Sequence, residues 1–310
     1  MNLGVPQGAV LGPLLFLIYI NDMYMSCKNL KFIHYADDTT AFISGPNHSD
    51  VIAIINEDLD RLYIWLQSNR LTLNANKSSF MIHGHFNELN SINISIRNER
   101  LTQTSTAKFL GITIDEKLNF REHIQNVICK VGRVSGLIWR IKGTVPRKIL
   151  RLMYQSLAGS QLSYGILAWG GGNITEFKRL QAVQNRIIRN IYGSSSPSMY
   201  QSNKILPLVE IFHFFASIKL YNEINCTNDH SYFNERVQNL QNNHSHDTRF
   251  VNNNNINVPF FTRARGHSSF LYKSIRFWNN LPPDIKNIPS IGSFKNKMKL
   301  HLLDQLSLSV

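Results

Sequence analysis

The sequence predicts an α+β fold in which short strands dominate the first third of the chain and helices the remainder. Between residues 31 and 115, apolar and polar residues alternate in short runs, which is typical of half-buried strands. From Phe120 onward, apolar residues recur every three or four positions, which is typical of helices that bury one face. We therefore expect a strand-containing region at 1–115 and mostly helical structure after it.

Composition excludes several classes of protein. The chain has 310 residues, of which 43% are hydrophobic, so it can bury a sizeable core. Cys27, Cys129 and Cys226 lie far apart, which excludes a disulfide framework and a conventional zinc module and suits a reducing compartment. No signal peptide precedes the first motif, and the apolar run 9–20 is too short to cross a bilayer. We expect an intracellular protein without a membrane span.

The first element is a loop that leads into a helix. Residues 4–8 read GVPQG, a rigid segment in which Gly8 would let the backbone approach a ligand closely. The apolar run from Leu14 to Ile20 then suits a buried helix.

Residues 31–44, KFIHYADDTTAFIS, predict a hairpin of two buried strands, Lys31–Ala36 and Thr40–Ser44, with Asp37 and Asp38 at its tip. One Asp suits a turn, because its side chain can bond to its own backbone. Two adjacent carboxylates repel each other unless a cation lies between them, and Mg²⁺ binds through one or two carboxylates together with substrate phosphates. The alternative is an ordinary solvated turn.

The following elements complete the strand-containing region. Residues 51–69 predict an amphipathic helix, because apolar residues recur at three- and four-residue steps. Its acidic residues, Glu57, Asp58 and Asp60, are expected on the outer face. Residues 79–83 predict a strand, and residues 91–115 predict small antiparallel strands.

The helical remainder carries most of the positive charge. Apolar stripes predict helices over about 123–134, 149–157, 177–191 and 206–224, with Gly170–Gly172 separating the second from the third. Residues 1–120 have a net charge of −2, residues 121–193 of +10, and residues 194–310 of +5. A helical segment so rich in Lys and Arg indicates binding to a phosphate backbone, although a solvated basic surface is the alternative for each single residue.

The last third of the chain contains a polar segment and a short helical segment. Residues 225–257 include 11 asparagines, which predicts a long flexible connection. Cys226, His230, His244 and His246 lie there, but their spacing fits no compact zinc module. Residues 260–306 predict two short helices, at about 268–280 and 293–306, joined by Pro282-Pro283.

Two of these segments occur in the order and spacing of a known family. GVPQGAVLGPLLFLIYIND (4–22) and YADD (35–38) resemble motifs B and C of the reverse transcriptases of LINE-type, non-long-terminal-repeat retrotransposons. Further segments resemble later parts of these enzymes: motif D at 71–84, motif E or primer grip at 108–115, the thumb and its continuation at 119–193, and a block near the end of their reading frames at 260–288.

The resemblance implies how the chain is organised. It implies a truncated polymerase palm with antiparallel strands around the YADD hairpin at 1–115, followed by a mostly α-helical thumb and continuation at 116–224. An Asn-rich flexible linker at 225–259 and a small helical segment at 260–310 complete the expected order.

The resemblance also implies an activity and its participants. The family's enzymes are RNA-directed DNA polymerases that join a primer 3′-hydroxyl to the α-phosphate of a deoxynucleotide, with an RNA template, a DNA primer and two Mg²⁺ ions. Asp37 and Asp38 correspond to the catalytic metal ligands, and Lys77 to the lysine that neutralises or protonates pyrophosphate. The implied substrate-binding residues are Pro6, Gln7 and Gly8 around template and nucleotide, Tyr35 and Ala36 under the primer end, and Phe109, Leu110 and Gly111 in the primer grip.

Part of the family pattern is not found in this sequence. The palm of this family needs a further aspartate, in motif A, on a strand before motif B, and Met1 lies directly before motif B. We therefore expect a C-terminal portion of a reverse transcriptase that lacks fingers and motif A and is inactive by itself, with Mg²⁺ bound fully only in the intact parent. A non-catalytic nucleic-acid-binding remnant, decayed or host-recruited, is the alternative. The family also implies a ribonucleoprotein in the cytoplasm and nucleus.

Overall fold

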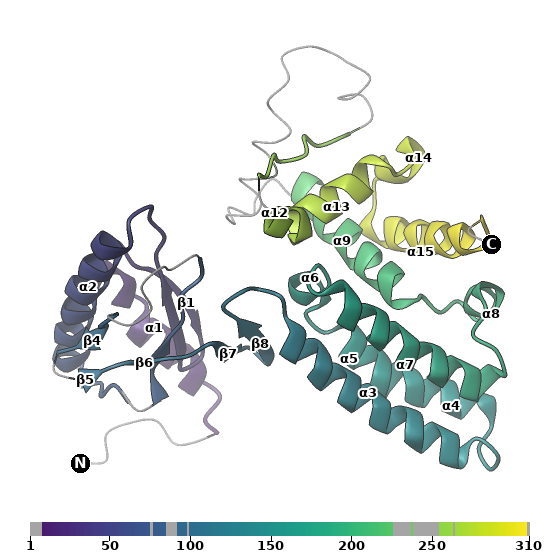
Figure 1. Ribbon diagram of the computed structural model, residues 1–310, viewed down its shortest axis with the longest axis horizontal. Coiled ribbons are helices and arrows are strands. Elements are labelled where there is room, and N and C mark those ends of the chain that lie inside the picture. Colours follow the sequence, from purple (N-terminus) through teal and green to yellow (C-terminus); the bar gives the residue numbers. More distant parts are fainter. Residues whose placement is uncertain are drawn as a thin grey trace. The chain divides into compact units, whose positions relative to one another are not determined.

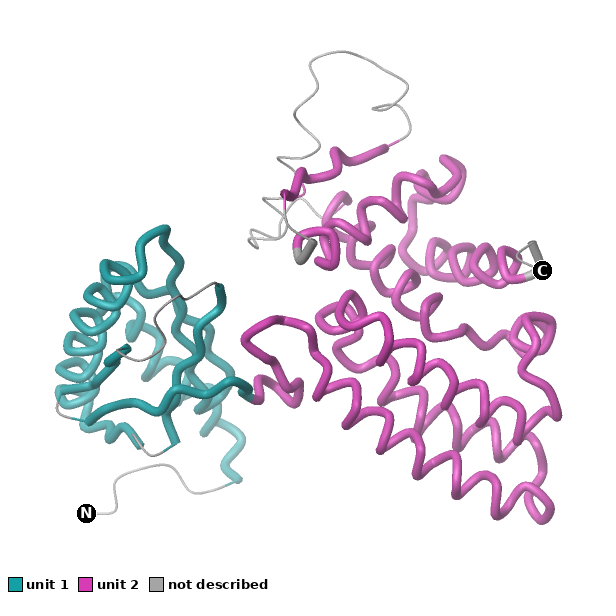
Figure 2. The backbone as a smooth tube through the Cα atoms, in the orientation of Figure 1, with its two compact units in different colours: residues 1–107 teal, residues 108–310 magenta. Residues whose placement is uncertain are grey.

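A computed structural model describes residues 8–74, 77–84, 92–97, 99–225, 237, 254–262 and 264–308. The chain divides into two compact units, residues 1–107 and residues 108–310 (Figure 2). Helices and strands both occur along the chain (Figure 1), so the mixed composition predicted from the sequence is present.

The first unit contains two substantial helices, one hairpin and several two-residue strands. Its helices are α1 (Gly12–Ile20), the 3-10 turn η1 (Met23–Ser26) and α2 (His48–Ser68). Its strands are β1 (Lys31–Tyr35), β2 (Asp38–Phe42), β3 (Ser79–Phe80), β4 (Ser95–Ile96), β5 (Glu99–Arg100) and β6 (Thr102–Gln103).

The core of the first unit forms along α2. Leu59, Leu62 and Leu66 recur at three- and four-residue steps and are buried, as the predicted amphipathic helix requires. Buried isoleucines of the β4 region, Ile92 and Ile94 among them, belong to the same cluster. Burying each such side chain stabilises the fold by about 1.5–3 kcal/mol.

The hairpin and α1 are more exposed than the sequence predicted. Every residue of β2 is exposed, and Tyr35 of β1 is 62% exposed. In α1, which is apolar along its whole length, only Ile20 is buried, whereas Ile18 is 64% exposed. Apolar helices are usually covered by other protein, so this surface is suited to packing against further polypeptide.

The short strands differ in direction. β4 and β5 are antiparallel, as predicted, whereas β3 and β6 pair in parallel through Ser79↔Thr102 and Phe80↔Gln103. The prediction of antiparallel strands over 91–115 is therefore wrong for β6. Residue alternation reports which faces are buried, not strand direction, so the sequence held no signal for this pairing.

The second unit begins with a hairpin and continues as helices. The hairpin consists of β7 (Thr106–Phe109), which crosses the unit boundary, and β8 (Ile112–Asp115). The helices that follow are α3 (Arg121–Ile141), α4 (Arg147–Met153), the π-helix η4 (Tyr154–Gly159), α5 (Ser160–Ser163), α6 (Ile166–Trp169), α7 (Ile174–Tyr192), α8 (Pro197–Ser202) and α9 (Leu208–Asn225).

Helices α3 and α7 lie side by side and supply much of the first helical core (Figure 1). Val131 of α3 and Ile187 of α7 are fully buried, as is Trp169 of α6. Side chains fix where both helices begin. The Asp115 carboxylate accepts hydrogen bonds from backbone N–H groups just before α3, and Asn173 accepts one from the Glu176 N–H at the start of α7.

Four further helices follow: α12 (Ala264–Ser268), α13 (Phe270–Asn279), α14 (Pro283–Lys286) and α15 (Ile291–Leu308). Of these, α13, α14 and α15 form a second core with α9 (Figure 1). Trp278 of α13 and Phe294 of α15 are almost fully buried, and the Phe294 ring stacks on Tyr221 of α9 at 4.3 Å. The two predicted C-terminal helices are therefore present, with α14 between them.

Helices α13 and α14 hold the backbone of residues 254–256. The Trp278 indole donates to the Asn254 carbonyl at 2.9 Å. The Asn279 amide group bonds both the N–H and the carbonyl of Ile256, at 2.9 and 2.7 Å. The Lys286 ammonium donates to the Asn255 side chain at 2.6 Å. We call this set of contacts the 254–256 clamp.

Several predictions concern residues outside this description. Pro6 and Gln7 lie outside the described residues, as do Cys226, His230, His244 and His246 together with most of the Asn-rich segment. Within the described ranges, no helix is both long enough and apolar enough to cross a membrane.

Candidate active site

The predicted hairpin is present, and its tip carries both adjacent carboxylates. Strands β1 and β2 pair in the register Lys31↔Phe42 to Tyr35↔Asp38, which leaves Ala36 and Asp37 as a two-residue turn. Asp38 is thus the first residue of β2, two positions earlier than the predicted strand start. All four residues of the YADD segment are exposed.

The turn at the tip is backbone-strained. Ala36 has φ 53°, in the left-handed region that residues other than glycine enter at a cost of about 1–3 kcal/mol. A positive φ at the first turn position is typical of two-residue hairpins, because it matches the twist of the strands. The small side chain of Ala36 suits this tight turn. The carboxylates of Asp37 and Asp38 remain exposed to solvent.

The tip supplies part of a metal-binding set. Two adjacent carboxylates provide the hard oxygen ligands that Mg²⁺ prefers, so Asp37 and Asp38 fit such an ion from one side. Among the described residues, no group of three or more His, Cys, Asp or Glu side chains is placed to hold a metal ion.

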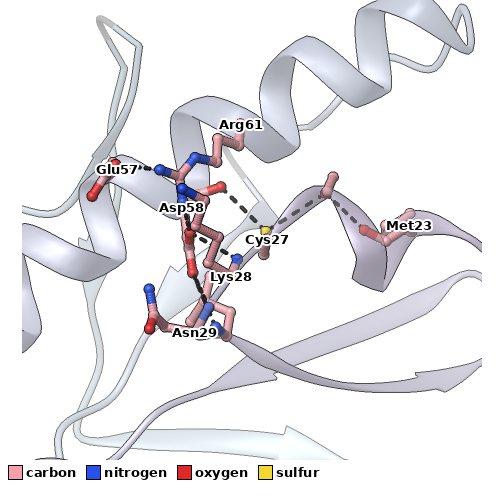
Figure 3. A network of polar contacts seen from close by, with 9 residues as sticks. Met23, Cys27, Lys28, Asn29, Glu57, Asp58 and Arg61 are labelled. Carbon is pink, nitrogen blue, oxygen red and sulfur yellow. Dashed lines mark hydrogen bonds and ion pairs between the residues drawn. The ribbon is translucent and has the colours of Figure 1, made fainter.

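A buried carboxylate anchors the chain where β1 begins (Figure 3). Asp58 of α2 is fully buried and accepts hydrogen bonds from the backbone N–H groups of Lys28, Asn29 and Leu30, at 3.1, 2.7 and 3.0 Å. The Arg61 guanidinium donates to the same carboxylate at 2.7 Å. The three residues before the YADD hairpin are thereby fixed to α2.

The pKa of Asp58 reflects these contacts. Burial by itself raises the pKa of this carboxyl group, but the three N–H donors and the Arg61 guanidinium outweigh burial, so the pKa lies below its usual 3.8. Asp58 is therefore a carboxylate at every pH at which the protein would work.

The prediction that Asp58 lies on an acidic outer face of α2 is wrong. Glu57 does bond Arg61 from the exposed side, but Asp58 points into the unit. The sequence shows only that these residues are neighbours. The N–H groups that Asp58 bonds lie 28 to 30 positions earlier in the chain, so no local pattern reveals them.

The predicted primer-grip residues form a second hairpin tip. Phe109 ends β7, and Leu110 and Gly111 form the turn before β8, with φ 45° and 81°. The Tyr164 hydroxyl donates to the Leu110 carbonyl at 2.7 Å, and a Cβ at Gly111 would lie 3.6 Å from the Tyr164 ring. Tyr164 braces this turn, and sequence reasoning did not identify it.

The remaining predicted site residues lie on loops. The exposed Lys77 follows Asn74, whose carbonyl accepts the Lys77 backbone N–H at 3.1 Å. Gly8 is exposed with φ 87°, a conformation that favours glycine. The structure brings Tyr35, Ala36 and the two aspartates together in one hairpin and places the Phe109–Gly111 turn in the other.

The helices of the second unit carry the basic surface that charge counting predicted. Lys130, Arg133 and Arg140 follow an exposed face of α3, opposite its buried face. Further exposed basic residues lie at Arg147 and Lys148 of α4 and at Lys178, Arg179, Arg186 and Arg189 of α7. The buried Glu176 forms ion pairs with Arg121 and Arg179. Most of the positive charge of 121–193 therefore faces solvent.

Comparison with known proteins agrees with the motifs. Residues 1–114 match the family described as reverse transcriptase (RNA-dependent DNA polymerase). The chain is 28% identical over 208 residues to the RNA-directed DNA polymerase from mobile element jockey of Drosophila melanogaster, and this alignment covers 62% of the chain and 22% of that relative. It is 31% identical over 207 residues to the probable RNA-directed DNA polymerase from transposon BS of the same species, with the same two coverages.

A third relative aligns over a larger share of its own length. The chain is 23% identical over 196 residues to the Retrovirus-related Pol polyprotein from type-1 retrotransposable element R1 of Nasonia vitripennis, covering 60% of the chain and 58% of that relative. No solved structure matches the chain. The resemblance to LINE-type reverse transcriptases is thus confirmed, and the chain spans about a fifth of the length of the first two relatives.

Proposed function

We propose, from the match of residues 1–114 to reverse transcriptases, that this chain is the palm and thumb portion of an RNA-directed DNA polymerase from a non-long-terminal-repeat retrotransposon. The observation that carries the proposal is the pair Asp37 and Asp38, exposed at a strained hairpin tip within that matched segment. Its substrates are an RNA template, a DNA primer and deoxynucleotides.

In this reaction, the hairpin tip presents the metal-binding carboxylates to the primer end. The chemistry that two Mg²⁺ ions supply when bound is stabilisation of charge on the attacking and leaving oxygens. Asp37 and Asp38 would hold these ions from one side, and in the intact parent the motif A aspartate would complete the oxygen shell. The small Ala36, with Tyr35 beside it, leaves room for the primer 3′ end.

Other residues would position the substrates. Pro6, Gln7 and Gly8 would line the template and nucleotide pocket. The Lys77 ammonium, on an exposed loop, would neutralise the departing pyrophosphate or give it a proton. The turn at Phe109, Leu110 and Gly111, braced by Tyr164, would hold the primer strand.

A primer-extension assay tests the catalytic proposal. Residues 1–310 by themselves should not extend a DNA primer on an RNA template, because the described residues supply metal ligands from the hairpin tip only. Joined to an N-terminal segment that carries fingers and the motif A aspartate, the chain should extend the primer when Mg²⁺ is present. Asp37→Ala should then abolish extension.

The matched control is Asp50→Ala, which removes an exposed carboxylate near the start of α2. This variant should keep the activity of the joined protein. Extension by residues 1–310 alone, or undiminished extension by the Asp37→Ala protein, would contradict the proposal.

The basic face of α3 should bind the RNA–DNA duplex through phosphates. Each phosphate contact contributes about 0.9 to the slope of log affinity against log salt concentration. Changing both Lys130 and Arg133 to Gln should therefore weaken duplex binding and lower that slope by about 2. Fluorescence anisotropy at 50–200 mM salt, roughly the range over which such contacts weaken, measures both quantities.

The matched control removes the same charge elsewhere. Lys295 and Lys297 are exposed on α15, and changing both to Gln should leave the salt slope unchanged. Equal slopes for the α3 double variant and the unmodified chain would show that this face does not bind the duplex.

A further inference from the structure

Residues 260–276 are rich in aromatic and basic residues, and the proposed polymerase reaction assigns no role to them. The stretch 260–280 contains four basic residues, Arg263, Arg265, Lys273 and Arg276, and no acidic residue. Its aromatic residues include Phe260, which is 88% exposed. A ring so exposed offers a face on which an unpaired base can stack.

Three rings that follow Phe260 in the sequence, those of Phe261, His267 and Tyr272, form an ordered cluster. The His267 imidazole lies 4.6 Å from the Tyr272 ring, nearly perpendicular to it, and the Phe261 ring is 6.2 Å from the same tyrosine. The exposed Arg276 guanidinium lies over the Tyr272 ring at 5.6 Å. Gly266 is required for this arrangement, because a Cβ there would lie 2.2 Å from the Phe261 ring.

The cluster is fixed to the helices of the second unit. A Cβ at Gly171 would lie 2.2 Å from the Ser268 carbonyl, so the end of α12 rests directly on the glycine loop before α7. The Lys273 ammonium donates to the Gly171 carbonyl at 3.1 Å, and burial lowers the pKa of Lys273. These contacts hold α12 and α13, which carry the His267 and Tyr272 rings, against the loop before α7.

We propose that Phe260, His267 and Arg276 bind single-stranded nucleic acid, with unpaired bases stacking on the two rings and a phosphate group pairing with the Arg276 guanidinium. Bases stack on exposed aromatic side chains whatever their identity, and arginine and lysine attract the backbone. A duplex hides the faces of its bases, so the exposed rings favour a single strand. The absence of acidic residues from 260–280 suits a polyanion rather than a basic protein partner.

Short homopolymers test the site on the full chain. Fluorescein-labelled oligo(dT) and oligo(rU) share the base and phosphate chemistry and separate DNA from RNA as the natural strand. Phe260→Ala should weaken binding of at least one oligomer about tenfold, since a stacked base contributes about 1–3 kcal/mol. Phe260→Trp should retain it. Arg276→Gln should weaken binding and lower the salt slope by about 0.7, the contribution of one phosphate contact on a single strand.

Two control variants remove the same groups elsewhere in the second unit. Phe215→Ala removes a 37% exposed ring from α9, and Lys297→Gln removes one exposed charge from α15. Both should bind the oligomers as the unmodified chain does. Thermal unfolding of every variant identifies any that have lost the fold, and Phe260→Trp keeps the test valid if Phe260→Ala is among them.

Cross-linking with oligomers that contain 5-iodouracil locates the bound strand. Cross-links at Phe260, His267 or Tyr272 are expected, and they should persist when Lys130 and Arg133 of α3 are changed to Gln. The cross-linking result can therefore contradict the single-strand site without contradicting the polymerase proposal, and the primer-extension result can do the reverse. The proposal is overturned if Phe260→Ala and Arg276→Gln bind both oligomers unchanged, or if all cross-links fall within 121–193.

Discussion

Three aspartates of the first unit differ in what surrounds their carboxylates. Asp37 and Asp38 lie exposed at a hairpin tip, where their oxygens face solvent and can meet a cation. Asp58 is fully buried, and its oxygens are occupied by three backbone N–H groups and Arg61. Asp37 and Asp38 are therefore free to bind a cation, whereas Asp58 fixes the backbone just before β1.

Asp58→Asn should destabilise the first unit by about 1–3 kcal/mol, because an amide NH₂ would face backbone donors that then lose their acceptor. Hydrogen exchange at Lys28, Asn29 and Leu30 should become faster, and the denaturant midpoint of the full chain should fall. The pKa of Asp58 is lowered in the fold. Its contribution is therefore present above pH 3.8 and is lost as the pH falls through the lower, folded value.

Glu57→Gln is the matched control, because it removes the exposed partner of the same arginine. Exposed ion pairs contribute about 0–1 kcal/mol, so this variant should behave nearly as the unmodified chain. Equal stability of the Asp58→Asn and Glu57→Gln proteins would contradict the anchoring role of Asp58.

At the level of elements, the 254–256 clamp gives a structural role to part of the segment 260–288. The sequence analysis assigned that segment only a family resemblance. Trp278, Asn279 and Lys286 lie in the stretch that reads WNNLPPDIK, and each bonds a group in residues 254–256. The clamp thus joins two segments that are far apart in sequence. The Trp278 indole and the Asn279 amide donate to backbone carbonyls, and the Lys286 ammonium donates to an amide oxygen.

Lys286 should make the stability of the clamp depend on pH. Burial lowers its pKa from 10.5 to about 8, so the unfolded chain holds this proton more tightly than the folded one. Stability should therefore rise as the pH increases from about 8 towards 10.5, by at most about 3 kcal/mol. Melting temperatures of the unmodified and Lys286→Met chains between pH 7.5 and 9.5, roughly the window in which this ammonium titrates, give the difference.

The rise should be absent or smaller in the Lys286→Met chain. Lys295→Met, which changes an exposed lysine of α15, should show the same pH dependence as the unmodified chain. Parallel curves for Lys286→Met and the unmodified chain would show that this ammonium does not titrate near pH 8.

The sequence predicted the elements that bury one face. It did not predict features that depend on contacts between residues far apart in the sequence. Apolar spacing predicted α2, α3 and α7, because a buried helical face leaves a local period. It did not predict the π-helix η4, whose neighbours on both sides are α-helical, nor the parallel pairing of β3 with β6. The hairpin tip was predictable because the turn and its two aspartates are adjacent in sequence.

At the scale of the whole molecule, two helical cores share one element. Phe212 of α9 belongs to the first core and Leu220 of α9 to the second, so α9 connects them. The site residues that sequence reasoning missed, Asp58 and Tyr164, both act on backbone atoms of another element. Such residues belong to no sequence motif, because the backbone groups that they bond lie far from them in the sequence.

The shared helix has a consequence for the integrity of the chain. Helices α13 and α15 pack directly against α9 through buried side chains such as Trp278 and Phe294. Val237 is fully buried in the same core, so a point between α9 and α13 adds to this packing as well. If the chain were cut elsewhere between α9 and α13, these buried contacts should keep α13 and α15 bound to α9 as a non-covalent subunit.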